Sequence, residues 1–237
     1  MASFSYLCDD LLTDSHSMII SSISYKGGVG KSTVAQNLAV CFAHSGHKVC
    51  IIDADETQAS MSWTGVRFEK DITPVIQSVG LTDAKAFVGN VKGQYENFDI
   101  IIIDCPPSLS PIAIKAMYLS HLLIIPVTPT GGSDIWVTEK LLEKYTDIRE
   151  EKGSEIPAYF LVNQFEPNVN LHRASLTVFE ALQEEFKIKM FDTRLNKRVA
   201  YGEANARGMG VYEYDNPKAK EEIIELANEI LKIGENI

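Results

Sequence analysis

The sequence predicts an α/β fold, a doubly wound and mostly parallel sheet with helices on both faces. Segments typical of strands alternate with segments typical of helices along the chain, as in folds built from strand–helix–strand units. A continuous apolar run, Ile100–Ile103, ends at Asp104, which is typical of a central parallel strand covered on both faces. A glycine-rich loop at residues 26–30 joins the first expected strand to the first expected helix, at the edge of the sheet where such folds bind ligands.

The elements follow from local patterns. The segment 18–24 reads as a short buried strand, and Lys31 to Ser45 has apolar residues at helical spacing with Gly46 as its stop. The last helix begins at Pro217, with Asn216 as its cap. Between them we expect strands at 48–53, 73–77, 100–103, 121–127, 158–163 and 188–191, and helices at 57–68, 82–91, 111–119, 133–151 and 171–186.

Length and composition indicate an ordinary globular protein. The 237 residues are 45% hydrophobic and 23% charged, and we expect residues 18–237 to form a single domain. Residues 1–17 have an acidic middle and no basic segment, so they indicate a flexible N-terminal extension, or a start upstream of the true one. The net charge of −10 argues against broad attraction to nucleic acid or anionic membranes, but it leaves room for a local basic patch.

The segment KGGVGKST, residues 26–33, has the form of a phosphate-binding loop. The usual pattern, G-x-x-x-x-G-K-[ST], requires a glycine at position 25, where this chain has Tyr25. Glycines let backbone N–H groups turn inward around phosphate oxygens, and the next helix adds the positive end of its dipole. We expect Lys31 to reach the β- and γ-phosphates, Ser32 to offer its hydroxyl to Mg²⁺, and Thr33 to contact the α-phosphate. The predicted nucleotide-binding residues of this loop are Lys26, Gly27, Gly28, Val29, Gly30, Lys31, Ser32 and Thr33.

This loop resembles the deviant Walker A box of the ParA/MinD ATPases, a family of P-loop NTPases. In that family the early lysine, here Lys26, is the signature residue. The resemblance implies that Lys26 reaches across a homodimer interface to the phosphates of the partner's ATP. Electrostatics is consistent with this role of Lys26. Two Mg·ATP groups that face each other repel, and a lysine from each subunit offsets their negative charge. Dimerisation then depends on nucleotide.

Two acidic segments extend the resemblance. IIDADETQAS, residues 51–60, resembles the family's D-x-D-P-Q segment, and IIIIDCPPS, residues 100–108, resembles its Walker B strand. The resemblance implies that Asp53 and Asp104 support the Mg²⁺ shell and that Asp55 orients the attacking water. The predicted catalytic residues are therefore Lys26, Lys31 and Asp55. Glu56 and Thr57 stand where the family has Pro-Gln, so the geometry after Asp55 is open. The alternative for Asp53 and Asp55 is a solvated carboxylate at a strand end, and for Asp104 it is a strand-terminal aspartate that caps a turn.

Two further segments are similar to the family. FLVNQ implies that Asn163 contacts adenine, with a turn asparagine that bonds its own backbone as the alternative. TRLNKR places Arg194, Lys197 and Arg198 where the family binds DNA non-specifically, with a solvated basic loop as the alternative. The stretch 198–222 resembles the family's C-terminal region, in which a helix carries Glu-Ala.

Missing features narrow the choice within the family. The cysteines lack the spacing of an iron–sulfur site, and the C-terminal helix is acidic on its polar face, unlike a membrane-binding helix. The resemblance thus implies a small ParA-like ATPase that forms an ATP-dependent sandwich dimer, hydrolyses ATP slowly with Mg²⁺, binds DNA non-specifically and positions a plasmid, chromosome region or other cargo. We expect a cytoplasmic, nucleoid-associated protein stimulated by a ParB-like or other adaptor protein, without membrane attachment. The alternatives are a MinD-like positioning ATPase and a metabolic ATP-dependent ligase of the dethiobiotin synthetase type, which a second, substrate-sized pocket would favour.

Overall fold

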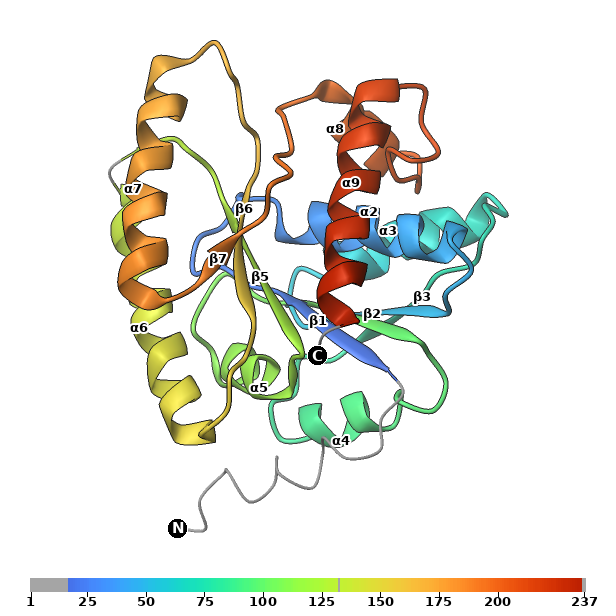
Figure 1. Ribbon diagram of the computed structural model, residues 1–237. Helices are drawn as coiled ribbons and strands as arrows, with labels where there is room; N and C mark the ends of the chain where they lie inside the picture. The colour runs from blue at the N-terminus through green and yellow to red at the C-terminus, as the bar shows by residue number, and fades with distance from the viewer. Residues whose placement is uncertain (1–16, 132, 236–237) are drawn as a thin grey trace.

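A parallel sheet forms the centre of the protein (Figure 1). The computed structural model describes residues 17–131 and 133–235. Within them, seven strands pair in the order β3-β2-β4-β1-β5-β6-β7, and every pairing between neighbouring strands is parallel. The strands are β1 (Met18–Ser22), β2 (Val49–Asp53), β3 (Gln77–Gly80), β4 (Ile100–Asp104), β5 (Leu122–Val127), β6 (Ala158–Val162) and β7 (Lys189–Met190).

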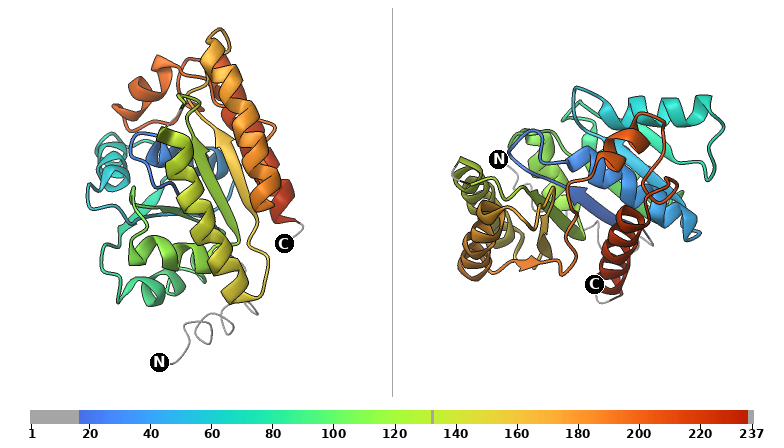
Figure 2. Two further views of the ribbon diagram at one scale, coloured as in Figure 1. Left: turned by 90° about the vertical axis from the view of Figure 1, so that its left-hand side faces the viewer. Right: turned by 90° about the horizontal axis from the view of Figure 1, so that it is seen from above.

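Helices cover both faces of this sheet, as predicted (Figure 2). One apolar cluster joins the sheet to α4, α5, α6 and α7, and a second joins its other face to α2, α3, α8 and α9. The helices are α2 (Lys31–His44), α3 (Ala59–Glu69), α4 (Phe87–Lys92), α5 (Pro111–Leu119), α6 (Ser133–Lys152), α7 (Asn170–Phe186), α8 (Val199–Asn205) and α9 (Pro217–Gly234). The central strands β1, β2 and β4 are buried over almost their whole length, because both faces are covered.

The last helix begins where the sequence predicts. The Asn216 side chain accepts a hydrogen bond of 3.0 Å from the backbone N–H of Ala219, and Pro217 occupies the first turn. Its apolar side packs on α2 in the core, and Ile223, Leu226 and Ile230 are fully buried there. The amphipathic tail is therefore used for packing within the chain.

Two sequence predictions need correction, and a third falls almost wholly outside the described residues. The strand expected at 73–77 begins only at Gln77, because Pro74 has no N–H to give to a ladder and its carbonyl oxygen instead accepts bonds from the Arg67 guanidinium. The helix expected at 82–91 begins at Phe87, after a turn in which Asp83 accepts a bond from the Lys85 N–H. Residues 1–16 of the predicted extension lie outside the described residues, and Ser17, which is described, is buried.

Candidate nucleotide-binding site

The phosphate loop lies at the carboxyl end of β1 and leads directly into α2. Gly28 and Gly30 have positive φ angles of 78° and 95°, a conformation that side chains with a Cβ rarely adopt. At Gly30 there is also no room, because an added Cβ would lie 2.2 Å from the Asn163 amide nitrogen. The loop therefore requires glycine here for two reasons, backbone conformation and the close approach of a neighbouring side chain.

Two side chains that follow β6 hold the phosphate loop by hydrogen bonds. The Asn163 side chain donates a hydrogen bond of 2.7 Å to the carbonyl oxygen of Val29, and its own oxygen accepts from the Gln164 backbone N–H. The Gln164 side chain donates a bond of 2.9 Å to the carbonyl oxygen of Gly28. Asn163 is buried and both ends of its amide are engaged, so its contact with adenine stays a prediction. Sequence reasoning missed Gln164, whose only signal was its place in the FLVNQ segment.

Lys31 is folded back onto its own loop. Its ammonium group donates a bond of 3.1 Å to the carbonyl oxygen of Lys26, and the side chain is buried. Burial lowers the pKa of Lys31, while the carboxylates of Asp104 and Asp55 act against that shift. Lys26 is half-buried, and its backbone N–H donates to the Ser24 hydroxyl. Lys26 thus lies in the loop after β1, and Lys31 is the first residue of α2 and bonds back to that loop.

Asp104 ends β4 beside the loop and is fully buried. Its Oδ2 accepts a bond of 2.8 Å from the Ser60 hydroxyl, whereas its Oδ1 has no hydrogen-bond partner among the described residues. Burial raises the pKa of Asp104 to about 6, against the effect of the Ser32 and Ser60 hydroxyls. Buried polar atoms normally have a hydrogen-bond partner or bind an ion, so this carboxylate oxygen is a candidate ligand for a bound group.

A Mg²⁺ ion with its bound waters fits this position. Mg²⁺ keeps several waters and usually takes one or two protein ligands together with substrate phosphates. The Ser32 hydroxyl and the free Asp104 oxygen are suitable donors of this kind. Among the described residues no group of three or more His, Cys, Asp or Glu side chains is arranged to hold a metal by itself.

Asp53 lies beside Asp104, because β2 and β4 pair with these two residues in register. Its carboxylate accepts three backbone N–H groups, from Asp55, Ser60 and Met61, at 3.2, 2.8 and 2.9 Å. Burial raises the pKa of Asp53, and these three bonds act in the opposite direction. Asp53 thus anchors the first turn of α3, and its support of a Mg²⁺ shell stays a prediction.

Asp55 lies beyond the end of β2, in a turn of its own. Its Oδ1 accepts a bond of 2.9 Å from the Thr57 N–H, and Gln58 follows with a positive φ of 50° before α3 starts. The stretch that departs from the family pattern therefore folds into a compact turn that leaves Asp55 half-buried. The role of Asp55 in holding a water stays a prediction.

Sequence reasoning missed Ser60. Its backbone N–H binds Asp53 and its hydroxyl binds Asp104, so one residue contacts both buried carboxylates. The sequence offered no signal beyond the position of Ser60 near the end of the Asp53 segment.

The predicted DNA-binding residues lie next to this site but differ in their surroundings. The backbone of residues 195–197 is hydrogen-bonded to Phe165, two positions after Asn163. Arg194 is exposed and stacks over the Phe165 ring, and exposed Lys197 pairs with Glu166 at 2.9 Å. Arg198 is held by Glu222 of α9 through several hydrogen bonds.

Comparison with known proteins shows the family of the chain. The family model described as the CobQ/CobB/MinD/ParA nucleotide binding domain matches residues 20–211. The chain belongs to this family. The match includes the phosphate loop, both acidic segments and Asn163. The ParA/MinD resemblance read from the sequence is thereby confirmed.

Curated relatives are similar over most of their length. The maintenance of carboxysome distribution protein A of Halothiobacillus neapolitanus is 29% identical over 87% of this chain and 93% of that protein. The sporulation initiation inhibitor protein Soj of Bacillus subtilis is 25% identical over 91% and 99%. Proteins of the ParA/MinD group are ATPases, and this chain is similar to members that position other cell components.

Solved structures show the same fold. Apo McdA from Cyanothece covers 91% of this chain and all of its own, with a TM-score of 0.76 at 19% identity. The cell division ATPase MinD of Pyrococcus furiosus has a TM-score of 0.68 at 22% identity and covers 91% of this chain and 99% of its own. The predicted P-loop NTPase fold is confirmed. Among the described residues, no helix is long and apolar enough to cross a bilayer.

Proposed function

We propose that this protein is a ParA-like ATPase that uses an ATP-dependent homodimer to partition or position a cargo. The observation that carries the proposal is the two-lysine loop at the end of β1, which lies beside the unpartnered oxygen of Asp104. ATP and Mg²⁺ are the cofactors of this proposal. Relatives that include a carboxysome distribution protein, Soj and the chromosome partitioning protein ParA of Caulobacter vibrioides support it.

In this proposal the loop holds the phosphates of ATP. The backbone N–H groups of residues 27–31 and the start of α2 attract the phosphate oxygens. Phosphate charge offsets the burial of Lys31, so its ammonium form is stabilised when nucleotide is bound. Ser32 and Asp104 hold the magnesium shell, which neutralises charge on the phosphates, and Thr33 contacts the α-phosphate. Asn163 and Gln164 keep the loop in shape through the carbonyl groups of Val29 and Gly28.

Dimerisation and hydrolysis depend on two further residues of the site. Lys26 serves the ATP of the partner subunit, and Asp55 orients the attacking water. The motifs contain no arginine finger, so the basal rate is slow, and a ParB-like or other adaptor protein accelerates it.

The dimer binds DNA without sequence preference through exposed basic side chains near residue 195. Arg194 and Lys197 are the exposed members of this group, which supports a role for them. Arg198 contributes less, because it is half-buried and several hydrogen bonds hold it to Glu222, whereas Lys197 stays exposed beside its partner Glu166. With a net charge of −10, the chain requires such a local patch for binding phosphates. We therefore infer a cytoplasmic protein that associates with the nucleoid through its ATP-bound dimer.

A metabolic ligase on the same scaffold is the alternative. The fold alone allows it, since cobyrinic acid a,c-diamide synthase from Mycobacterium smegmatis has a TM-score of 0.67 at 14% identity. A ligase needs a second substrate beside the nucleotide. A cavity of about 630 Å³ is lined by residues of α3 and the chain leading into β3, and no residue of the phosphate loop lines it. This cavity gives the ligase no support.

The test compares the wild-type protein with Lys31→Ala. We expect the wild type to dimerise with Mg·ATP in light-scattering chromatography, to bind random-sequence duplex DNA only in that state, and to coat the nucleoid as a fluorescent fusion. Lys31→Ala should lose all three properties while keeping its fold by circular dichroism. A wild-type protein that binds Mg·ATP but stays monomeric and diffuse would contradict the proposal.

A further inference from the structure

A chain of side-chain hydrogen bonds leads from Asp104 to α8. Asn205 donates to the Gln36 side-chain oxygen at 2.6 Å, Gln36 donates to the Ser60 hydroxyl oxygen at 3.3 Å, and Ser60 donates to Asp104 at 2.8 Å. These four residues, the polar chain, come from α8, α2, α3 and β4. Gln36, Ser60 and Asp104 are buried, and Asn205 is exposed. The polar chain therefore connects the surface to the carboxylate predicted to support Mg²⁺.

The hydrogen bonds of the polar chain all donate in one direction, from Asn205 toward Asp104. The Ser60 hydroxyl has a single proton, and that proton is available to Asp104 because Gln36 supplies the donor in their shared bond. The Gln36 amide keeps this orientation because its oxygen accepts from Asn205. The bond from Asn205 therefore fixes the orientation of the Gln36 amide, and the bond from Gln36 directs the Ser60 hydroxyl proton to Asp104.

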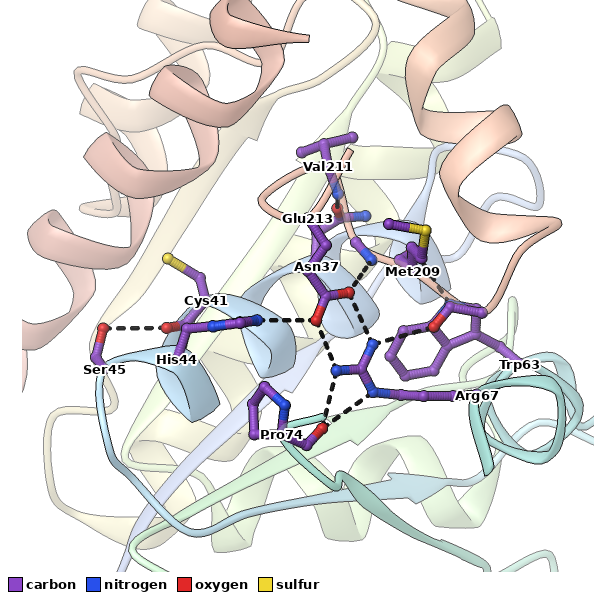
Figure 3. A network of polar contacts seen from close by, with 12 residues as sticks. Asn37, Cys41, His44, Ser45, Trp63, Arg67, Pro74, Met209, Val211 and Glu213 are labelled. Carbon is purple, nitrogen blue, oxygen red and sulfur yellow. Dashed lines mark hydrogen bonds and ion pairs between the residues drawn. The ribbon is translucent and has the colours of Figure 1, made fainter. Parts of the chain in front are cut away.

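The segment that follows α8 is tied to α2 and α3 by two more bonds, drawn in Figure 3. The Val211 N–H donates to Asn37 at 2.7 Å, next to Gln36 on α2, and the Trp63 indole donates to the Met209 carbonyl oxygen at 3.3 Å. Residues 205–211 are thus held by side chains whose helices also contact the nucleotide site. The basic residues 194–198 directly precede α8.

We propose that Gln36 is a positioning residue that couples the Asp104 carboxylate to residues 205–211. Hydrogen bonds in a buried chain polarise one another, so a change of partner at one end alters the bonds at the other end. Arrival of Mg²⁺ and nucleotide at Asp104 changes how Ser60, Gln36 and Asn205 bind, and this rearranges the segment beside the basic surface. The inference rests on the proposed binding of Mg·ATP and adds the route by which the site reaches α8.

The fluorescence of Trp63 can report on changes in residues 205–211. It has two tryptophans, Trp63, which is buried on the Met209 carbonyl, and Trp136, whose exposed fraction is 69%. A Trp136→Phe parent protein therefore leaves Trp63 as the single indole. We expect its emission to shift when Mg²⁺ is added to the ATP complex, and hydrogen exchange of residues 205–211 to slow by at least roughly five-fold, the lower end of typical coupling between sites.

Two variants in the Trp136→Phe parent break the polar chain at different points. Gln36→Leu removes its middle with little change in volume. Asn205→Asp changes only the exposed end of the polar chain. A carboxylate has no N–H to donate to the Gln36 oxygen, so the Gln36 amide turns its nitrogen toward residue 205. Its oxygen then faces Ser60, and the Ser60 hydroxyl donates to Gln36 instead of Asp104. Both should abolish the Mg²⁺-dependent Trp63 shift and exchange protection, while ATP affinity without Mg²⁺, measured calorimetrically, stays within about three-fold. Asn97→Ala, at an exposed side chain that donates to the Gly93 carbonyl oxygen of its own turn, is the control and should keep the full response.

The outcomes separate the two proposals. A parent protein that fails to bind Mg·ATP overturns the proposed function, and the inference falls with it. A parent that binds Mg·ATP, together with variants that keep the full Trp63 shift, overturns the inference alone. Asn205→Asp is the more decisive variant, because its exposed position makes misfolding a poor explanation of any loss.

Discussion

Arg67 of α3 and Glu213 of the segment before α9 form a two-pronged ion pair, with N–O distances of 2.7 and 2.6 Å (Figure 3). Both side chains are buried, and His44 of α2 adds a third contact to the same carboxylate at 2.8 Å. The guanidinium also donates to the carbonyl oxygens of Pro74 and Gly208. This pair joins α3, the chain leading into β3 and the C-terminal region.

We predict that Arg67→Ala lowers the free energy of unfolding by about 3–5 kcal/mol, because Glu213 and two carbonyl groups are left buried without their partner. Arg67→Lys should also destabilise the protein, since a single ammonium group cannot make the several hydrogen bonds of the planar guanidinium. Urea unfolding measures both. Arg173→Ala, at an exposed arginine of α7, is the control and should change stability by less than about 0.5 kcal/mol. A loss for Arg67→Ala as small as that of the control would contradict the prediction.

The same pair predicts a pH dependence. Burial alone would raise the pKa of Glu213, but the hydrogen bonds from Arg67 and His44 outweigh it and hold the pKa below its ordinary value of 4.5. Since the folded pKa is depressed, the stabilisation is complete above pH 4.5 and is lost as the pH falls through the folded pKa. Glu213→Gln should therefore be less stable than the wild type at pH 7, and the difference should shrink below pH 4.5. Urea unfolding across this range measures it, and a gap that does not change with pH would show the carboxylate charge to be unimportant.

Lys26→Ala should keep monomeric ATP binding within a few-fold and lose the ATP-dependent dimer. Lys31 and the backbone groups of the loop remain, so the nucleotide keeps its own cradle, whereas the repulsion between two facing ATP molecules is no longer offset. Calorimetry measures ATP binding, and sedimentation with Mg·ATP measures assembly. Lys31→Ala is the contrasting variant, since it should lose both properties. A normal dimer of Lys26→Ala would show that the lysine does not act across the interface.

Asp55→Ala should bind ATP and dimerise but release phosphate at least ~100-fold more slowly, as expected when a group that orients the nucleophile is removed. Asp53→Ala should behave differently, because Asp53 accepts three backbone N–H groups at the start of α3. We expect that variant to lose stability by about 1–3 kcal/mol as well as activity. Phosphate release, dimer lifetime and urea unfolding are compared for both variants. Hydrolysis at the wild-type rate by Asp55→Ala would assign the water to another residue.

The double change Arg194→Glu and Lys197→Glu should remove binding to random-sequence duplex and leave basal ATP hydrolysis unchanged. Binding by the wild type should fall steeply with salt, since it depends on released counterions. Arg198→Glu is a poor test of DNA contact, because it would face Glu222 and destabilise the fold. Fluorescence anisotropy with labelled duplex measures binding. Unchanged affinity of the double variant would move the DNA surface elsewhere on the protein.

Local sequence patterns were sufficient for most of the fold. The apolar run ending at Asp104, the cap at Asn216 and the loop between β1 and α2 each depend on residues within a few positions of one another. Such short-range preferences can be read directly from the sequence. The two errors arose where a local feature overrode the apolar pattern, namely Pro74, which has no N–H for a ladder, and the turn in which Asp83 accepts from the Lys85 N–H.

The sequence by itself determined the α/β order, the phosphate loop and the family of the chain. Only the tertiary structure decided which side chains surround the predicted carboxylates. Ser60 reaches Asp104, and Gln36 reaches Ser60, because α2 and α3 pack on the same face of the sheet, and Arg67 meets Glu213 across 146 positions of the chain. A contact of that kind has no local pattern, because it depends on the path of the whole backbone and on the burial that leaves each polar group without water as a partner.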